Sequence, residues 1–443
     1  MANRSASDSS FYAGKTILAP MVRAGRTPLC MLALKNGADL VYSEEIVDQR
    51  LLASKRIENE ILGTIDYVIE TDVVLRIDPK KEAPRLVLQI GTNDPQRAVE
   101  VLKKTQKDVA AFDVNMGCPK PFSISGGMGA ALLKQPDKVK KILTALVDAA
   151  EIPISCKIRV HETPEETIKF AKMCESCGIS AIGVHGRRRD ERPGDLNRDS
   201  EVREVAEALK IPVIANGGSG MIKCFEDIET FRENTGASSV MIARKALSNP
   251  SIFRKEGLKT MTEDIEDFLD FVCEYDENFT ATKYVVQRIL GGEQEFDPRG
   301  RETVLSATVH EICKAWNRSE KFEEFKKARL RHSHKRHFVP DPETGICFVD
   351  ISFPPKRLRV NAGAGSPKCV LNRYCDEISE QRPIYHLIHR GSDGRYEAIA
   401  ELLGKKFSSR IPQPNKKMAE QVAALVALMG LEQRERLAGE WED

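Results

Sequence analysis

The sequence predicts an α/β fold: a closed (β/α)8 TIM barrel, then a helical domain and a C-terminal α-β-β-β-α module. Eight short apolar runs recur through the first 245 residues, mostly separated by helix-like segments. From about Lys255 the apolar residues repeat at helical spacing, as Ile265, Phe268, Leu269 and Val272 do. A helix, three strand-like runs and a second helix end the chain. Its 443 residues allow two or three such domains.

The eight apolar runs are near-continuous, which is typical of parallel strands that are buried on both faces. Eight of them favour a closed barrel over an open doubly wound sheet. Helix starts are predicted at Asp94-Pro95 and Thr163-Pro164. The long segment from Ile46 to Pro84 predicts an extra hairpin or excursion. The predicted strands are 16–21, 40–45, 85–90, 111–117, 154–159, 181–186, 213–218 and 239–244.

Polar residues at the C-terminal ends of barrel strands form the active site in this type of fold. A single polar residue at such an end would mean little, because satisfied polar side chains are common at barrel rims. A full ring of them favours an active site. In strand order the residues at these ends are Pro20, Met21 and Arg23; Glu44; Gln89; Asn115 and Cys118; Lys157; His185; Asn216, Gly217 and Gly218; and Ala243 and Arg244.

Cys118 is the candidate for chemistry in this ring. It lies at the end of a buried strand, is followed by the stiff Pro119 and precedes the glycine-rich run 126–129. The alternative is a buried structural thiol, which is the usual state of a lone cysteine. Cys174 and Cys177 form a CxxC pair, but zinc requires four ligands and the pair lies in a helical pattern. We interpret the pair as packing and predict no metal site.

The ends of the last two strands predict a phosphorylated ligand. The run 216–220, Asn-Gly-Gly-Ser-Gly, follows the seventh strand, and Arg244 ends the eighth. Glycines let a ligand approach backbone N–H groups, and the loops after strands seven and eight are the usual phosphate site of this fold. Arg244 adds a permanent charge that can bind a phosphate.

Composition indicates a cytoplasmic protein without a membrane span. The chain has 67 Lys and Arg against 66 Asp and Glu, so its net charge does not indicate a nucleic-acid partner. The eleven cysteines form no regular framework, and the sequence shows no signal peptide or long apolar run. Between residues 326 and 373, however, eleven Lys and Arg face three acidic residues, a net charge of +8. A basic run of this density next to a folded module favours phosphate contacts over a merely solvated linker.

Several motifs in order resemble the flavin-dependent tRNA-dihydrouridine synthases. They are 17–22 (ILAPMV), 113–119 (DVNMGCP), 126–132, 157–159 (KIR), 184–187 (VHGR) and 214–218 (IANGG). The resemblance implies FMN bound in the barrel, NADPH or NADH as reductant, and a uridine of tRNA as substrate. One departure is the stretch 123–125, where many relatives carry a basic residue and this chain has Ser-Ile-Ser.

The resemblance also implies residue roles. Cys118 would protonate C5 of the uracil ring, since a thiol of pKa about 8.5 is mostly protonated at neutral pH. Lys157 would lie at the pyrimidine edge of the flavin, Gln89 would fix its uracil-like edge, and Asn115 would orient the base. For Glu44 and Gln89 a purely structural role as loop ties stays open. The implied cofactor-binding residues are Pro20, Met21, Val22, Glu44, Gln89, Lys157, His185, Asn216, Gly217, Gly218, Ala243 and Arg244, and Arg187 is implied for RNA.

The C-terminal module resembles a double-stranded RNA-binding domain. Lys416 and Lys417 in the first turn of its closing helix suit phosphates across a groove. Lys356, Arg357, Arg359 and Lys368 are further candidates for phosphate contacts. The predicted domains are 1–254 (barrel), 255–338 (helical), 339–365 (basic linker) and 366–432 (RNA module).

A barrel joined to such a module resembles the eukaryotic cytosolic branch of the family, which modifies position 20 of the tRNA D-loop. This branch implies a monomer that acts on tRNA and not on DNA. Two alternatives stay open: a flavin oxidoreductase for free pyrimidines, and a regulatory protein that binds double-stranded RNA and has a non-catalytic barrel. The sequence does not choose between NADPH and NADH.

Overall fold

The computed structural model describes residues 9–192, 194–338, 340–353, 355, 358, 365–390, 394–437 and 441. By its internal contacts the chain divides into two compact units, residues 1–325 and 326–443. No helix among the described residues is long and apolar enough to cross a membrane.

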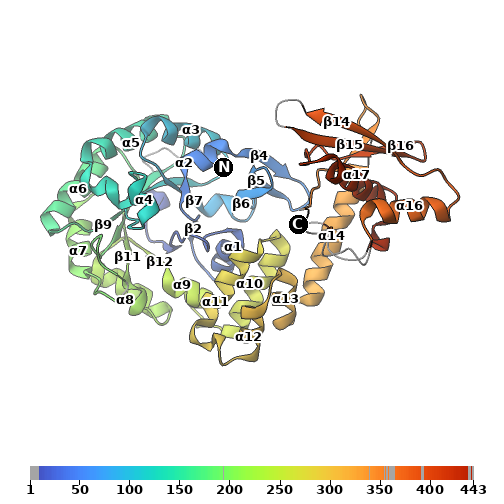
Figure 1. The fold of residues 1–443 in the computed structure, drawn as a ribbon. Helices are drawn as coiled ribbons and strands as arrows, with labels where there is room; N and C mark the ends of the chain where they lie inside the picture. The colour runs from blue at the N-terminus through green and yellow to red at the C-terminus, as the bar shows by residue number, and fades with distance from the viewer. Residues whose placement is uncertain are drawn as a thin grey trace. The chain divides into compact units, whose positions relative to one another are not determined.

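Eight parallel strands close into a barrel in the first unit (Figure 1), as the sequence predicts. The pairing of β2 with β7 completes the circle. Except for β7, which extends one residue further, each strand stops at or before its predicted end, because the last residues turn away into the loops after the strands. The strands are β1 (Thr16–Leu18), β2 (Leu40–Tyr42), β7 (Leu86–Gly91), β8 (Ala111–Asn115), β9 (Ile154–Arg159), β10 (Ala181–His185), β11 (Val213–Asn216) and β12 (Ser239–Ile242).

Helices surround the barrel and begin where the sequence predicts. Asp94 caps one helix through the N–H of Arg97, and Thr163 caps another through the N–H of Glu166. A proline follows each cap, at a position where a helix needs no N–H donor. The helices of the barrel are α1 (Thr27–Lys35), α2 (Asp48–Ala53), α3 (Pro95–Thr105), α4 (Pro121–Ser125), α5 (Pro136–Ala149), α6 (Pro164–Ser176), α7 (Asp199–Ala208), α8 (Phe225–Thr235) and α9 (Arg244–Ser248).

The predicted excursion between the second and third barrel strands is confirmed. It starts with a two-residue strand, β3 (Ile46–Val47), that pairs with the end of β7. An antiparallel sheet of three strands then extends from the barrel, with β5 in the centre. Its strands are β4 (Lys55–Asn59), β5 (Thr64–Ile69) and β6 (Asp72–Ile77).

A helical segment follows the barrel within the first unit. Its first helix starts at a capping box of Thr260 and Glu263, and its predicted apolar face is buried. Cys174 on α6 and Cys177 directly after it are buried in the hydrophobic core, in agreement with the interpretation as packing. The helices of the segment are α10 (Met261–Tyr275), α11 (Phe279–Leu290), α12 (Pro298–Leu305), α13 (Val309–Ala315) and α14 (Ser319–His337), the last of which extends into the second unit.

The second unit has its own core and contains the predicted helix, three strands and helix. A further strand that the sequence analysis did not predict, β13, pairs in parallel with β16. Its three residues lie in the stretch that the charge pattern assigned to a basic linker, and Cys347 is buried there. The elements are β13 (Ile346–Phe348), α16 (Pro367–Glu377), β14 (Ile384–Arg390), β15 (Arg395–Leu402), β16 (Lys405–Ser408) and α17 (Lys416–Gly430).

Candidate active site

A buried polar network lies inside the barrel around Asp113 on β8. Its carboxylate accepts hydrogen bonds from Gln89 Nε2 (2.8 Å) and from Ser155 Oγ (2.7 Å), and Ser155 in turn contacts the Tyr12 hydroxyl (3.0 Å). Burial raises the pKa of Asp113 to about 6, although these hydrogen bonds and the charge of Lys157 oppose the rise. The network therefore fixes the amide of Gln89 at the end of β7, where the sequence predicts a contact to the cofactor.

Lys157 lies beside this network on β9. Burial and the positive charge of Arg159 lower its pKa to about 8, against the opposing charges of Asp113 and Cys118. A Cβ on Gly183 of the neighbouring strand would lie 3.2 Å from Lys157 Cγ, so the glycine leaves room for the lysine side chain. An ammonium group with this pKa is mostly charged at neutral pH and can also give up its proton.

The turn after β8 presents Cys118 at the mouth of the barrel. Asn115 Oδ1 accepts hydrogen bonds from the N–H groups of Gly117 (2.9 Å) and Cys118 (3.2 Å), which holds the turn in place. Cys118 is a free, partly exposed cysteine, whereas Cys156 on the next strand is fully buried. Burial and the nearby Glu45 carboxylate raise the pKa of Cys118 above its ordinary value. The sulfur is therefore a protonated thiol at neutral pH, which can donate a proton.

Positive charge gathers at the ends of β9, β10 and β12, around His185. Arg187 Nη1 donates a hydrogen bond to His185 Nε2 (3.0 Å) and another to the carbonyl of Gly217 (3.0 Å). An arginine can only donate, so Nε2 is the acceptor and the ring is neutral. Burial lowers the pKa of His185 well below its usual range, and four cations lower it further: Lys157, Arg159, Arg187 and Arg244.

Two glycines after β11, Gly217 and Gly218, determine how the loops around His185 pack. Gly217 has φ of +116°, and a Cβ there would lie 1.9 Å from Asn197 Oδ1 and 2.7 Å from the His185 ring. A Cβ on Gly218 would lie 2.6 Å from the Phe231 ring. No side chain fits at either position. Neighbouring protein groups fill the space at both glycines, so the glycines allow these loops to pack closely. The cations around His185 are the feature that suits a phosphate. This donor set fits the phosphate of the predicted cofactor.

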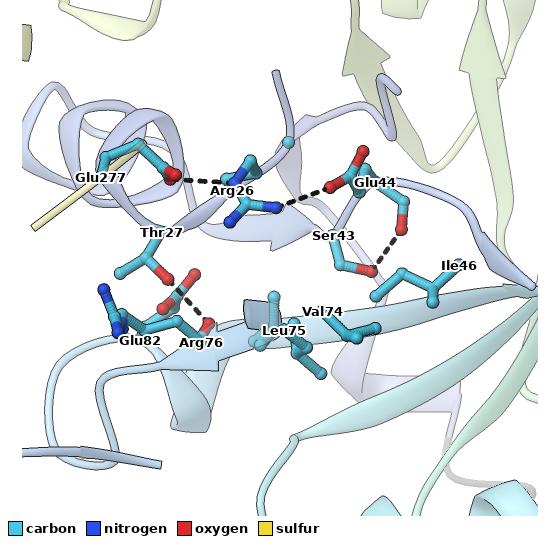
Figure 2. Close-up of a pocket in the computed structure, with 12 residues that line it drawn as sticks. Arg26, Thr27, Ser43, Glu44, Ile46, Val74, Leu75, Arg76, Glu82 and Glu277 are labelled. Atoms are coloured by element: carbon cyan, nitrogen blue, oxygen red, sulfur yellow. Dashed lines mark hydrogen bonds and ion pairs between the residues drawn. The ribbon is translucent and has the colours of Figure 1, made fainter. Parts of the chain in front are cut away.

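The remaining predicted cofactor contacts lie on the loops after β1, β2 and β12. Pro20, Met21 and Val22 follow β1 and are partly exposed, and Ala243 directly follows β12. Glu44 accepts hydrogen bonds from the N–H of Arg23 (2.8 Å) and from Arg26 Nη1 (3.2 Å), as Figure 2 shows for Arg26. These contacts match the structural alternative for Glu44, since they tie two loops together.

Sequence reasoning missed three residues of this site. Asp113 and Arg159 lie within the motifs 113–119 and 157–159. A charged side chain in a predicted barrel strand is the feature that could have identified them. Arg159 Nε donates to the carbonyl of Gly117 (2.9 Å) and so supports the Cys118 turn. Glu45 is buried next to that turn, but in the sequence it is the second of two adjacent glutamates and only Glu44 was selected. Arg187, predicted for RNA, is 6 % exposed and lies in the cationic group around His185.

The RNA-module candidates differ in their surroundings. Lys416 and Lys417 are exposed at the start of α17, where Asn415 caps the helix through the N–H of Met418. Lys368 instead pairs with the Glu420 carboxylate and lies over the Tyr385 ring, 4.4 Å from its centroid. The candidates Lys356, Arg357 and Arg359 lie outside the described residues.

The family model for dihydrouridine synthase (Dus) matches residues 17–335, and the model for the double-stranded RNA binding motif matches residues 367–431. These two matches define a class of barrel protein that carries an RNA-binding motif after the barrel. The chain belongs to the dihydrouridine synthase family and carries a C-terminal double-stranded RNA binding motif, so the predicted family and fold class are confirmed.

Relatives in two yeasts are named tRNA-dihydrouridine(20) synthase [NAD(P)+]. The Schizosaccharomyces pombe protein is 39% identical over 315 residues, which cover 68% of this chain and 64% of that protein. The Saccharomyces cerevisiae protein is 36% identical over 310 residues, which cover 64% of this chain and 79% of that protein. Among solved structures, one of a tRNA-dihydrouridine(20) synthase dsRBD domain is 25% identical, with a TM-score of 0.20, and covers 21% of this chain and 98% of that chain.

Proposed function

We propose that the protein reduces a uridine of tRNA to 5,6-dihydrouridine, at position 20 of the D-loop. The observation that carries this proposal is the partly exposed Cys118 thiol, held by Asn115 beside a cationic ring of strand ends. Family membership supplies the reaction class. The names of the two yeast relatives support both the position and NADPH or NADH as reductant.

The cofactor we propose is FMN at the mouth of the barrel. Its phosphate would be held by Arg244, by Arg187 and by the backbone of Gly217 and Gly218, and its ring edge by Gln89 and Lys157. When bound, the flavin supplies the hydride that the uracil ring receives at C6. The anchoring of Gln89 by Asp113 supports this assignment, because it presets the amide before any ligand arrives.

The residues of the chain carry out the proton step. Hydride addition at C6 leaves negative charge on the C4 carbonyl side of the ring, and C5 then requires a proton. Cys118 would donate it, since its raised pKa keeps the sulfur protonated until the ring becomes basic. Asn115 would contribute indirectly, because its side-chain oxygen fixes the turn that carries the thiol.

The RNA motif would bind tRNA by shape and backbone. Lys416 and Lys417 at the start of α17 can each meet a phosphate, and such contacts position an RNA without reading its bases. The expected cytoplasmic location and monomeric state stay predictions.

An absorbance experiment tests the proposal on the purified protein. Flavin bands should be visible, should bleach when NADPH is added without oxygen, and should return when unmodified tRNA is added. Recovery with free uridine instead of tRNA would favour the flavin oxidoreductase for free pyrimidines. A protein that stays colourless with added FMN, yet binds duplex RNA, would contradict the enzymatic function.

A further inference from the structure

A buried carboxylate lies beside the Cys118 turn without a hydrogen-bond partner. Glu45 is 9 % exposed, and neither of its carboxylate oxygens has a hydrogen-bond partner among the described residues. Burying a carboxylate without donors is costly, so a protein that keeps one at its reaction site does so against stability. Glu45 is absent from the roles that the family resemblance implies.

Strand register brings Glu45 to this turn. Ile46 on β3 pairs with Ile90 on β7, and Ile90 pairs with Val114 on β8, one residue before Asn115. Gly91, the last residue of β7, is the neighbour of Glu45: a Cβ on it would lie 2.7 Å from Glu45 Oε1. The glycine therefore leaves the space through which the carboxylate reaches the Asn115–Cys118 turn.

A second buried polar group, Ser123, lies close to both Cys118 and Glu45. The Ser123 hydroxyl on α4 is fully buried and, within the described part of the chain, makes no hydrogen bond. A Cβ on Gly129 would lie 2.3 Å from Ser123 Oγ and 3.1 Å from Cys118 Cβ, so serine and cysteine flank the same small space. This serine belongs to the stretch in which the sequence departs from many relatives.

Positive and negative groups near Cys118 have opposite effects on whether its sulfur keeps its proton. Lys157 and Arg159 on β9 are positive, and Lys120 follows the cysteine on its own loop; positive charge favours a thiolate. Glu45, from the β2–β3 connection, is the negative group. Burial raises the pKa of Glu45, and the nearby polar groups of Cys118 and Asn115, together with the charge of Lys120, oppose that rise. Burial raises the pKa of Cys118 as well, and the Glu45 charge adds to it.

We propose that Glu45 is a positioning residue for the reaction acid: its buried carboxylate keeps the Cys118 sulfur a thiol despite the surrounding cations. Without it, a site built to bind an anionic cofactor would also stabilise the thiolate, which has no proton to give. The inference rests on the proposed role of Cys118 as the acid. It adds a residue to that role and explains why an unpaired carboxylate is retained.

Alkylation of Cys118 tests the inference without flavin turnover. The full-length protein is treated with iodoacetamide between pH 6 and 10, and the rate at Cys118 is followed by peptide mass spectrometry. In Glu45→Gln the midpoint of the Cys118 rate profile should move to lower pH by about one unit, because one neighbouring negative charge is lost. Alkylation at pH 7.5 should accordingly become up to about tenfold faster.

Three comparisons make the result specific. Glu44→Gln is the matched control: its carboxylate faces Arg23 and Arg26, and the Cys118 profile should stay where it is. Cys369, which is exposed, reports in the same samples on any general change in reactivity. Glu45→Asp keeps the charge at a shorter reach, so its profile should lie between those of Glu45→Gln and the unchanged protein.

An unchanged or higher midpoint in Glu45→Gln would overturn the inference. If that variant does not fold, Glu45→Asp decides, and a profile identical to that of the unchanged protein counts against it. A separate experiment tests the proposed function. If Cys118→Ala forms dihydrouridine at the normal rate, Cys118 is not the acid, whatever the alkylation profiles show.

Discussion

At the scale of single residues, the environments of three neighbouring groups set their protonation at neutral pH. Cys118 is held as a thiol, His185 is neutral, and Lys157 has a pKa of about 8. Burial shifts each of the three toward its neutral form, and the excess of cations at the phosphate end pushes the histidine further in the same direction. The proposed proton donor and the proposed anion-binding residues are thus separate parts of one group of strand ends.

Replacement of Cys118 by alanine tests the donor. We expect Cys118→Ala to bind flavin and to be reduced by NADPH as the unchanged protein is, because the phosphate end and Gln89 are untouched. Formation of dihydrouridine should fall by about 10²- to 10⁴-fold, the usual contribution of a general acid. The measurement is single-turnover conversion of tRNA by pre-reduced protein. A rate within a factor of a few of the original would assign the proton to another group.

From the sequence, single site residues could be predicted only where the side chain itself indicated chemistry at a strand end. Cys118, Lys157 and Gln89 could be selected because chemistry-bearing side chains stand at strand ends. Glu45 could not, because its importance depends on the missing side chain of Gly91 across the β3–β7 pairing. The charge state of His185 could not be predicted either, since it depends on the Arg187 hydrogen bond and on cations from two other strands, β9 and β12.

At the scale of elements, Arg26 joins three parts of the first unit (Figure 2). Its guanidinium donates to Glu44 on the β2–β3 connection (3.2 Å), to the carbonyl of Val73 on β6 (3.3 Å) and to Glu277 after α10 (2.9 Å). Removing a partly buried arginine leaves two carboxylates without their cation. We expect Arg26→Ala to cost roughly 3 to 5 kcal/mol of stability, as for other broken buried pairs.

A surface pair between the same excursion and the same helix is the control for Arg26. Lys81 pairs with Glu274 at 2.9 Å, and both side chains are largely or partly exposed. Lys81→Ala should change stability by less than about 1 kcal/mol. Urea unfolding of both variants, followed by tryptophan fluorescence, measures the difference. Equal effects would mean that the Arg26 contacts contribute no more than surface pairs do.

Glu82, at the end of the excursion, makes stability depend on pH. Burial raises its pKa from 4.5 to about 8. The folded state therefore holds the proton more tightly than the unfolded state, and stability falls as pH rises from about 4.5 to about 8. Glu82→Gln cannot ionise, so its melting temperature relative to the unchanged protein should rise across this window. A difference that stays constant between pH 5 and 8 would contradict the protonated state of Glu82.

Element-level prediction succeeded where the pattern was long and regular. The eight barrel strands and the five-element core of the RNA module were all predicted, because buried parallel strands and amphipathic helices extend over enough residues to show their period. β13 has three residues and no detectable period, and its position depends on the edge that β16 offers. Six strand ends were predicted one to three residues too far into the loops, because the sequence pattern does not show where the pairing between strands stops.

At the scale of the whole molecule, the chain combines two units with separate cores, and the proposed function divides accordingly. The barrel carries the proposed redox site, while the RNA motif carries exposed cations at the start of α17. Affinity for tRNA should therefore depend on the second unit in a way that the reduction of flavin does not.

The double variant Lys416→Ala/Lys417→Ala in the full-length protein tests this division. Loss of two phosphate contacts should weaken tRNA binding and reduce the slope of log affinity against log salt by roughly one unit for each contact. Bleaching of the flavin by NADPH should be unaffected.

Lys368→Ala is the matched comparison, because its ammonium is already neutralised by Glu420, and its effect on the slope should be smaller. Binding titrations at several salt concentrations measure the slopes. An unchanged slope in the double variant would show that α17 does not face the phosphates, and would leave tRNA recognition to other cations of the chain.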